Sequence, residues 1–455
     1  MSNFRPCDRD TPYLLPPSVD EWLPLDHLAR FVVEIVEQLD LSAMVRQYRG
    51  AGSAAYHPAV LLGLLLYGYA TGTFSSRRLE RATYDSLAYR YIAGNTHPDH
   101  DTLCAFRKRF LGEIEALFVQ VLQIARQMKL LKLGTVALDG TKVHANASRH
   151  SALSYGHAKK IEVQLTAEVQ ELLARAEAAD SEPLPPDLDI PAELERREAR
   201  LAAIRAAQAE LEARAAERDA AAEAAYEAKL EAREQKARDT GKKPRGRTPA
   251  PPTTGVRDDD QVNLTDPDSR IMPVAGGGFE QCYNAQAAVD TDTMLIVATH
   301  LTQSASDQQQ LVPVLATLNA LPEDLGEVTR LLADSGYCSA ANVTACVNVG
   351  IEPSLACGRE AHHLPWQERF CEPPALSRPA SAIARMRHRL RTRDGRAWYA
   401  LRKQTVEPVF GCIKSAMGWR QFLLRGYRAV RGEWSLVGIA WNIRRMAALH
   451  ALASG

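Results

Sequence analysis

A short strand-forming run ends in an acid and a glycine at Thr135-Val136-Ala137-Leu138-Asp139-Gly140. Its β-branched and apolar side chains favour a buried strand, and the Asp-Gly pair is typical of a turn. A second run, Arg330-Leu331-Leu332-Ala333-Asp334, has the same character and is followed by Ser335-Gly336. We therefore expect two short strands, each of which ends at an aspartate.

Other strands and helices lie between and after these two runs. Residues 283–290 alternate in polarity, a turn follows, and residues 294–300 are mostly apolar, which predicts a β-hairpin. Helices are expected near 307–319 and 339–347, and a further strand at 351–355. This order predicts an α/β fold with a mixed central sheet flanked by helices. If the strands that end at Asp139 and Asp334 are neighbours, their carboxylates lie together at the ligand-binding edge.

The region before the first strand has a helical pattern. Residues 57–69 read as a buried helix, and Ser75-Ser76 as the start of the next one. Asp101 is placed to cap a basic helix over 102–128. Several short helices before a basic one resemble a helix-turn-helix module, which predicts DNA contacts for Arg107, Lys108 and Arg109. The alternative is that these residues only solvate the outer face of a helical bundle.

A composition rich in Ala, Glu and Arg begins after Ala158 and predicts an insertion. Apolar residues recur every three or four positions up to Leu172, prolines interrupt the chain at 183–191, and leucines seven apart then resume. This pattern is typical of a coiled coil and predicts an antiparallel helical hairpin, closed by a flexible linker that ends near Gly255. We hypothesise that the hairpin pairs with a second protomer. A self-contained hairpin is the alternative.

Charge and composition restrict the classes of partner. The net charge is zero, yet the residues from Arg359 to Gly455 carry 18 Lys and Arg against six Asp and Glu, which suits a polyanion such as DNA. The eight cysteines form no Cys-x-x-Cys pair, and no zinc site is expected. No apolar run approaches the roughly 18 residues of a membrane span. The N-terminal residues lack a signal-peptide pattern, so a cytoplasmic protein is expected.

Two neighbouring aspartates predict a divalent metal site. Close carboxylates repel each other unless a cation neutralises them, and oxygen ligands favour Mg²⁺ or Mn²⁺. Two such ions can hold the attacking and leaving oxygens of a phosphodiester. A third carboxylate from a helix would complete the site. Taken singly, Asp139 and Asp334 could also be an ordinary turn residue and an ordinary helix cap.

The run from Tyr399 to Lys414 resembles the Tyr-Arg-Glu-Lys signature of bacterial insertion-sequence transposases with a DDE (Asp-Asp-Glu) active site. Glu407 and Lys414 have the spacing of that signature. Arg402 is one residue from the strict position of its arginine and Lys403 occupies that position, so either residue is a candidate for the arginine role.

Two further runs look like the first and second aspartate motifs of that family, namely residues 136–142 and 332–337. The resemblance covers nearly all of the chain except the insertion. It implies an RNase H-like catalytic domain. The expected domains are a helical N-terminal DNA-binding domain over 1–130, the first part of the catalytic domain over 131–158, a coiled-coil hairpin and linker over 159–255, and the remaining catalytic domain with basic C-terminal helices over 256–455.

The resemblance also implies a DNA transposase in which Asp139, Asp334 and Glu407 hold two Mg²⁺ or Mn²⁺ ions. The ions activate water to cut the end of the element, and then the freed 3′-hydroxyl to attack target DNA. The implied partners are double-stranded DNA of the element ends and of the target, with a homo-oligomer assembled on chromosomal DNA. The rival functions are an RNase H-like nuclease without strand transfer and a non-catalytic DNA-binding protein descended from a transposase.

Other side chains near the signature are expected to contact DNA. Lys414 lies two helical turns beyond Glu407 and is placed to bind a phosphate. Tyr399 is expected to stack on the terminal nucleotide or, alternatively, to pack against the sheet. Alternating arginines lie just upstream and predict phosphate contacts on either a strand or a helix, at Arg385, Arg387 and Arg389.

Overall fold

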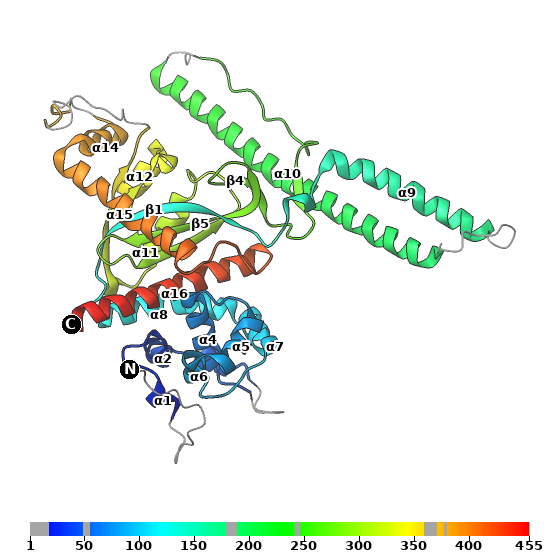
Figure 1. Cartoon of the computed structure of the whole chain (residues 1–455). Helices are drawn as coiled ribbons and strands as arrows, with labels where there is room; N and C mark the ends of the chain where they lie inside the picture. Colours follow the sequence, from blue (N-terminus) through cyan, green and yellow to red (C-terminus); the bar gives the residue numbers. More distant parts are fainter. Residues whose placement is uncertain are drawn as a thin grey trace, which may run out of the picture. The chain divides into compact units, whose positions relative to one another are not determined.

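The computed structural model describes residues 18–48, 55–178, 189–241, 246–358, 371–376 and 380–454 (Figure 1). The chain divides into two compact units, one formed by Met1–His144 with Tyr283–Gly455 and the other by Ala145–Cys282. The first unit contains both aspartates, and the second contains the predicted insertion. Within the described residues no single helix is long and apolar enough to cross a membrane, and only Pro58–Thr71 and Ser76–Asp85, a bent pair, meet that test jointly.

The sheet is mixed, as the sequence predicts. Among the described residues, six strands pair in the order β4-β5-β1-β7-β8, with β6 added to β5. β1, β7 and β8 run parallel to one another, and β5 and β6 form the predicted antiparallel hairpin. The strands are β1 Leu133–His144, β4 Arg270–Pro273, β5 Phe279–Asp290, β6 Ile296–Thr302, β7 Gly326–Ala333 and β8 Glu352–Leu355.

The prediction that Asp139 ends its strand was wrong. β1 continues to His144, and Gly140 lies inside it because its missing side chain makes room for polar groups, not because the chain turns there. Asp334 does follow β7 directly, and its carboxylate accepts a hydrogen bond from the backbone N–H of Gly336. Leu138 pairs with Ala333 across the two strands, so both aspartates follow one registered pair.

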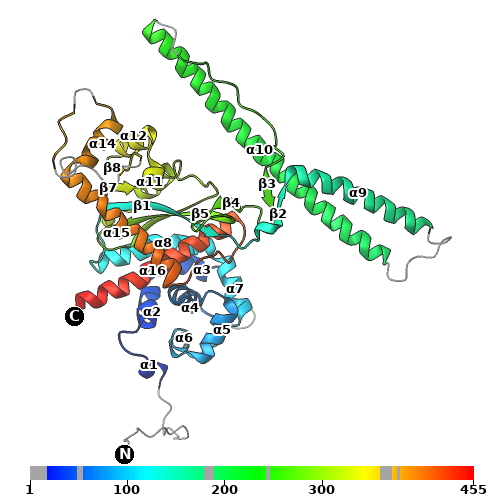
Figure 2. The ribbon, with the colours of Figure 1, turned by 45° about the horizontal axis from the view of Figure 1, so that its top comes forward.

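Helices cover both faces of the sheet (Figure 2). α15 (Arg393–Ser415) packs on β1 and β7, and α16 (Tyr427–Ser454) packs on β6. α11 (Leu311–Asn319) and α12 (Ala340–Asn348) lie on the opposite face and contact β6 and β8. α14 (Ala382–Arg391) precedes α15 and packs on α12 and β8.

The N-terminal helices pack on the outer side of α16, through contacts of α2, α4 and α8 with that helix. The predicted helix over 102–128 is two helices, because Phe110 leaves helical geometry and is completely buried between them. Asp99, and not Asp101, caps the first of these. The helices are α1 Val19–Trp22, α2 Leu28–Gln38, α3 Ser42–Val45, α4 Pro58–Thr71, α5 Ser76–Asp85, α6 Leu87–Ile92, α7 His100–Arg109 and α8 Leu111–Gln127.

A buried carboxylate, Glu433 of α16, joins α4 to the loop between α15 and α16. It accepts hydrogen bonds from the Tyr69 hydroxyl at 2.9 Å and from the backbone N–H groups of Leu423 and Leu424, each at 3.0 Å. Arg107 donates to the Tyr69 oxygen at 3.2 Å and faces the charge of Glu433. Burial raises the pKa of the Glu433 carboxyl, so this network compensates a charge that the core disfavours.

The second unit contains the predicted antiparallel hairpin. α9 (Tyr155–Ala178) and α10 (Ile190–Thr240) pack together, and β2 (Ala152–Ser154) pairs with β3 (Gln261–Asn263) at their base. Ion pairs from Arg205 to Glu162 and from Arg197 to Glu168 show that the helices run in opposite directions. Apolar residues line their contact, including Leu165, Leu201, Ile204 and Leu211.

α10 extends beyond α9, and the chain that returns from it is held against it. Gly246 accepts a hydrogen bond from Arg233 at 2.8 Å, and the Gly255 N–H donates to Asp219 at 2.5 Å. Residues 246–255, which the sequence analysis assigned to a flexible linker, are thus tied to α10 at both ends. Residues 242–245 of that linker lie outside the described part.

Replacing Glu433 by alanine is expected to lower the free energy of unfolding by about 3–5 kcal/mol, because the Tyr69 hydroxyl and two backbone N–H groups lose their acceptor and buried Arg107 loses the opposing charge. Glu115→Ala is the matched control: it removes the exposed partner of Arg431 and should cost less than about 1 kcal/mol. Urea denaturation followed by tryptophan fluorescence, to which buried Trp419 and Trp434 contribute, measures both free energies. An equal loss of unfolding free energy in the two variants would show that the Glu433 network does not stabilise the fold as described.

Candidate active site

Asp139 lies in a largely buried, negatively charged environment. Burial raises the pKa of its carboxyl to about 6; the Gly140 N–H and Arg402 oppose this shift, and the nearby charges of Asp334 and Asp307 add to it. The Gly140 N–H donates to Asp139 at 2.8 Å. Asp139 and Asp334, predicted from different motifs, are therefore close enough for each charge to affect the other.

α15 brings the third predicted acid to the aspartates. Arg402 donates to Asp139 Oδ2 at 3.1 Å and to Glu407 Oε1 at 2.9 Å, so one guanidinium joins carboxylates from β1 and α15. Only 8% of Arg402 is exposed, whereas the Glu407 side chain is 48% exposed. Lys403 is exposed to solvent. Arg402, and not Lys403, thus occupies the position beside the acids.

Lys414 and Tyr399 lie on the same helix as Glu407. The Lys414 ammonium donates to the Thr141 hydroxyl and, at 3.5 Å, to the carbonyl of Lys142, two and three residues beyond Asp139. Tyr399 is half-buried and interacts electrostatically with Arg402. The signature side chains therefore lie along the part of β1 that carries Asp139.

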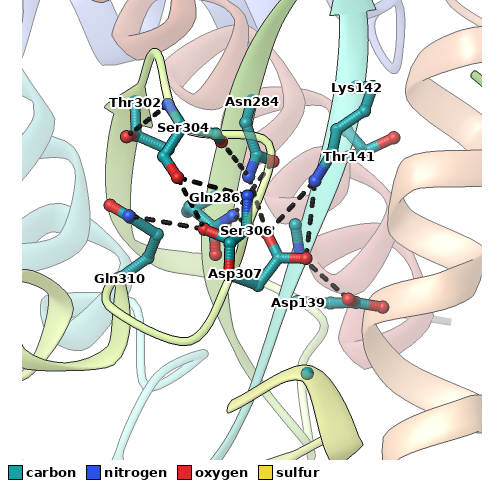
Figure 3. Close-up of polar contacts among 12 residues, drawn as sticks. Asp139, Thr141, Lys142, Asn284, Gln286, Thr302, Ser304, Ser306, Asp307 and Gln310 are labelled. Carbon is teal, nitrogen blue, oxygen red and sulfur yellow. Dashed lines mark hydrogen bonds and ion pairs between the residues drawn. The ribbon is translucent and has the colours of Figure 1, made fainter. Parts of the chain in front are cut away.

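A fourth carboxylate, Asp307, was missed by the sequence analysis (Figure 3). It lies just before α11, and its Oδ1 accepts hydrogen bonds from Asn284 at 2.6 Å and from Gln286 at 2.8 Å. Lys142 forms an ion pair with it at 3.3 Å. Two cations, Arg402 and Lys142, thus compensate four acids around β1.

Asp307 lies beside both aspartate motifs, and Gly140 is needed for its approach to the first. A Cβ on Gly140 would lie 2.1 Å from Gln286 Nε2 and 2.7 Å from Asp307 Oδ1. A Cβ on Gly336 would lie 3.8 Å from Asp307 Oδ2 and 3.0 Å from Asp334 Oδ1. Asp139-Gly140 and Asp334-Ser335-Gly336 therefore close around the same carboxylate.

One sequence signal could have revealed this cluster. Asn284 and Gln286 alternate on β5, and both are completely buried in a strand whose other residues are mostly apolar. Buried amides need partners, and the Tyr337 hydroxyl and Asp307 provide them for Gln286. Alternating amides in a core strand therefore indicate a polar site next to that strand.

The basic residues predicted to contact DNA have different surroundings. Arg107 is 6% exposed and belongs to the core, so we no longer assign it a DNA contact. Arg109 is held by the carbonyl of Gln47 at 2.7 Å, and Lys108 is exposed. The alternating arginines lie on a helix, α14, where Arg389 pairs with Glu352.

The donor set suits a divalent cation, although the side chains are not arranged as a closed metal cage. In the described part of the chain, no three His, Cys, Asp or Glu side chains are grouped as metal ligands. Asp139 and Glu407 instead share the Arg402 guanidinium. Mutual repulsion among Asp139, Asp334 and Asp307 is what a hard cation with oxygen ligands relieves, so these residues fit Mg²⁺ or Mn²⁺.

Gly140→Ala is expected to destabilise the first unit by about 1–3 kcal/mol, because the new methyl group overlaps Gln286 and Asp307. Gly134→Ala, in the same strand, is the control: a Cβ there meets nothing within 4 Å, and a change below about 0.5 kcal/mol is expected. Thermal unfolding monitored by near-UV circular dichroism distinguishes them. Equal midpoints for the two variants would show that the cluster does not pack as described.

Two family models match the chain. Residues 17–109 match a transposase domain (DUF772), and residues 261–443 match a transposase DDE domain, which includes Asp334 and Glu407 and begins after the hairpin helices. No curated protein and no solved structure matches the chain. A DDE domain implies an RNase H-like fold, and the mixed sheet with helices on both faces agrees with it. The chain therefore belongs to the insertion-sequence DDE transposases.

Proposed function

We propose that the protein cuts DNA at the ends of its own insertion sequence and joins the freed 3′-hydroxyl to target DNA. The observation that carries the proposal is the grouping of Asp139, Asp334 and Glu407 around one buried arginine in a chain of this family. Phosphodiester cleavage needs an activated oxygen nucleophile and stabilisation of a pentacoordinate phosphorus, and clustered carboxylates with divalent ions serve both needs.

Asp139, Asp334 and Glu407 would hold two Mg²⁺ or Mn²⁺ ions. When bound, such ions lower the pKa of water or of a hydroxyl and neutralise charge on the phosphate. Asp139 lies in β1, Asp334 directly follows β7, and Glu407 lies in α15, so packing of these elements sets the spacing of the three carboxylates. Asp307 adds negative charge on the other side of β1 and keeps Lys142 in place.

The cations of the site bind and orient the DNA. Lys414 is fixed against Thr141, where its charge can hold a phosphate beside the carboxylates. Arg402 holds Asp139 and Glu407 at a constant separation, and its buried Nε has no hydrogen-bond partner among the described residues. Tyr399, Lys403 and the arginines of α14, Arg385 and Arg387, are assigned to contacts with the DNA backbone or its terminal nucleotide.

Alanine at Asp139, Asp334 or Glu407 is expected to reduce cleavage at least about a thousandfold, or about 4 kcal/mol, with DNA binding retained. Purified protein is incubated with labelled DNA that carries the element end and Mg²⁺ or Mn²⁺. Asp394→Ala, an exposed acid at the start of α15, is the control and should cut normally.

The same assay separates the rival functions. A pre-cut end with a free 3′-hydroxyl, mixed with a target plasmid, reports strand transfer directly. Cleavage without joined product would support a nuclease, and end binding without either reaction would support a non-catalytic protein. Full activity in any one of the three acid variants would contradict the assignment of that residue.

Arg402→Ala is expected to slow cleavage about a hundredfold or more, because two carboxylates lose the group that holds them together. Lys403→Ala should change the rate less than about threefold, or about 0.7 kcal/mol. Arg402→Lys should restore little, since a single ammonium cannot bridge two acids as a guanidinium does. Rates are measured at saturating DNA. A larger loss in the Lys403 variant would assign the arginine role to Lys403.

A further inference from the structure

α4 and α5 have the geometry of a helix-turn-helix. α4 ends at Thr71, α5 begins at Ser76, and their directions differ by 96° across the short turn. In helix-turn-helix motifs, the two helices cross at about 90–120° through a turn of three or four residues that often contains glycine. Gly72 begins this turn with a φ of 87°, a conformation that glycine adopts without strain.

The inner face of α5 is fixed to the neighbouring helices. Leu79 is completely buried and packs so closely on α4 that a Cβ on Gly68 would lie 2.6 Å from its side chain. Glu80 accepts a hydrogen bond from the His100 backbone N–H at 3.1 Å, and its carboxylate lies 2.8 Å from the His100 ring, which ties α5 to α7. The orientation of α5 is therefore set by packing on two sides.

The outer face of α5 is basic and exposed. Arg77 and Arg78 have no hydrogen bond or ion pair with any described residue. The Arg81 side chain is 84% exposed, and among the described residues it pairs only with Asp85 of its own helix. α7, the basic helix predicted from the sequence, has fewer basic side chains available for DNA: Arg107 is buried, Arg109 is bound to Gln47, and Lys108 is exposed without such a contact to any described residue.

The turn of this motif adjoins the loop that leaves the active-site helix. A Cβ on Gly72 would lie 3.0 Å from the carbonyl oxygen of Met417, just after α15. Arg420 in that loop donates to the carbonyl of Lys414 at 3.0 Å. Arg420, Arg425 and Arg428 are exposed, so positive charge continues from Lys414 towards the turn before α5.

We propose that α5 is the recognition helix, which enters the major groove of double-stranded DNA and reads bases through Arg77, Arg78 and Arg81. The inference rests on the proposed function for the identity of its site, the end of the element. Residues at the N-terminal part of a recognition helix contact base edges, and arginine binds guanine in a bidentate manner. The basic loop after α15 then holds the phosphates between the recognised sequence and the cleavage site.

The experiment measures binding without catalysis. Full-length protein in EDTA is titrated against two labelled duplexes of equal length and composition, one with the element end and one with that sequence scrambled. Arg77→Ala, Arg78→Ala and Arg81→Ala are compared with Lys108→Ala as the matched control on α7. Thermal unfolding checks that each variant is folded. Wild-type midpoints are expected, because all four substituted side chains are exposed.

At least one α5 variant should lose about 5- to 150-fold in affinity for the element end and much less for the scrambled duplex. Lys108→Ala should leave the ratio of the two affinities unchanged. Equal losses on both duplexes, with a shallower salt dependence, would show phosphate contacts only and overturn base reading by α5. A lost preference in Lys108→Ala alone, or no preference in the wild type, would also overturn the proposal.

Cleavage is measured separately with Mg²⁺. A wild type that prefers the element end but does not cut it would contradict the proposed function and leave the recognition helix intact. An α5 variant that cuts the end at the wild-type rate when DNA is saturating, but needs a higher DNA concentration to reach that rate, would support both assignments.

Discussion

The parallel pairing of β1 with β7 sets the position of Asp139 relative to Asp334. Since Leu138 and Ala333 are partners, Asp139 and Asp334 follow at the same level of the sheet. Their charges then require compensation, which the protein supplies from both faces. Arg402 approaches from α15 and Lys142 pairs with Asp307 on the other side. The rest of the unit positions these two cations relative to one pair of strands.

Alternation along β1 explains why the site has two sides. Asp139 and Thr141 face α15, where they meet Arg402 and Lys414, whereas Gly140 faces the buried amides of β5 and Asp307. A side chain at position 140 would push Asp307 away from β1. With glycine there, Asp307 lies close enough for its charge to raise the pKa of Asp139. The pair Asp139-Gly140 therefore lies in an extended strand and does not form a turn.

Local pattern predicted much of this fold, because the β-hairpin, the strand before Asp334 and the long helices each have a strong period of their own. The prediction failed where long-range contacts decide the outcome. Arg107 has the appearance of a surface cation until Tyr69 and Glu433 enclose it. Asp307 resembles a helix cap until Asn284 and Gln286 bind it from a distant strand. The choice between Arg402 and Lys403 depended on which residue faces Asp139, and spacing within a helix could not determine this.

The ends of the second unit meet within one ladder, where the Ala145 N–H donates to the carbonyl of Gln281 at 2.8 Å. β1 and β5 are thus joined by a connection that contains an entire folded unit. Closing so long a loop by random search has a large entropic cost, which rises with the logarithm of the loop length. Once α9, α10 and the small β2–β3 ladder have formed, the two ends of this connection are already close together, so β1 and β5 can pair at a lower entropic cost. Folding of the inserted unit therefore lowers the entropic cost of bringing β1 and β5 together.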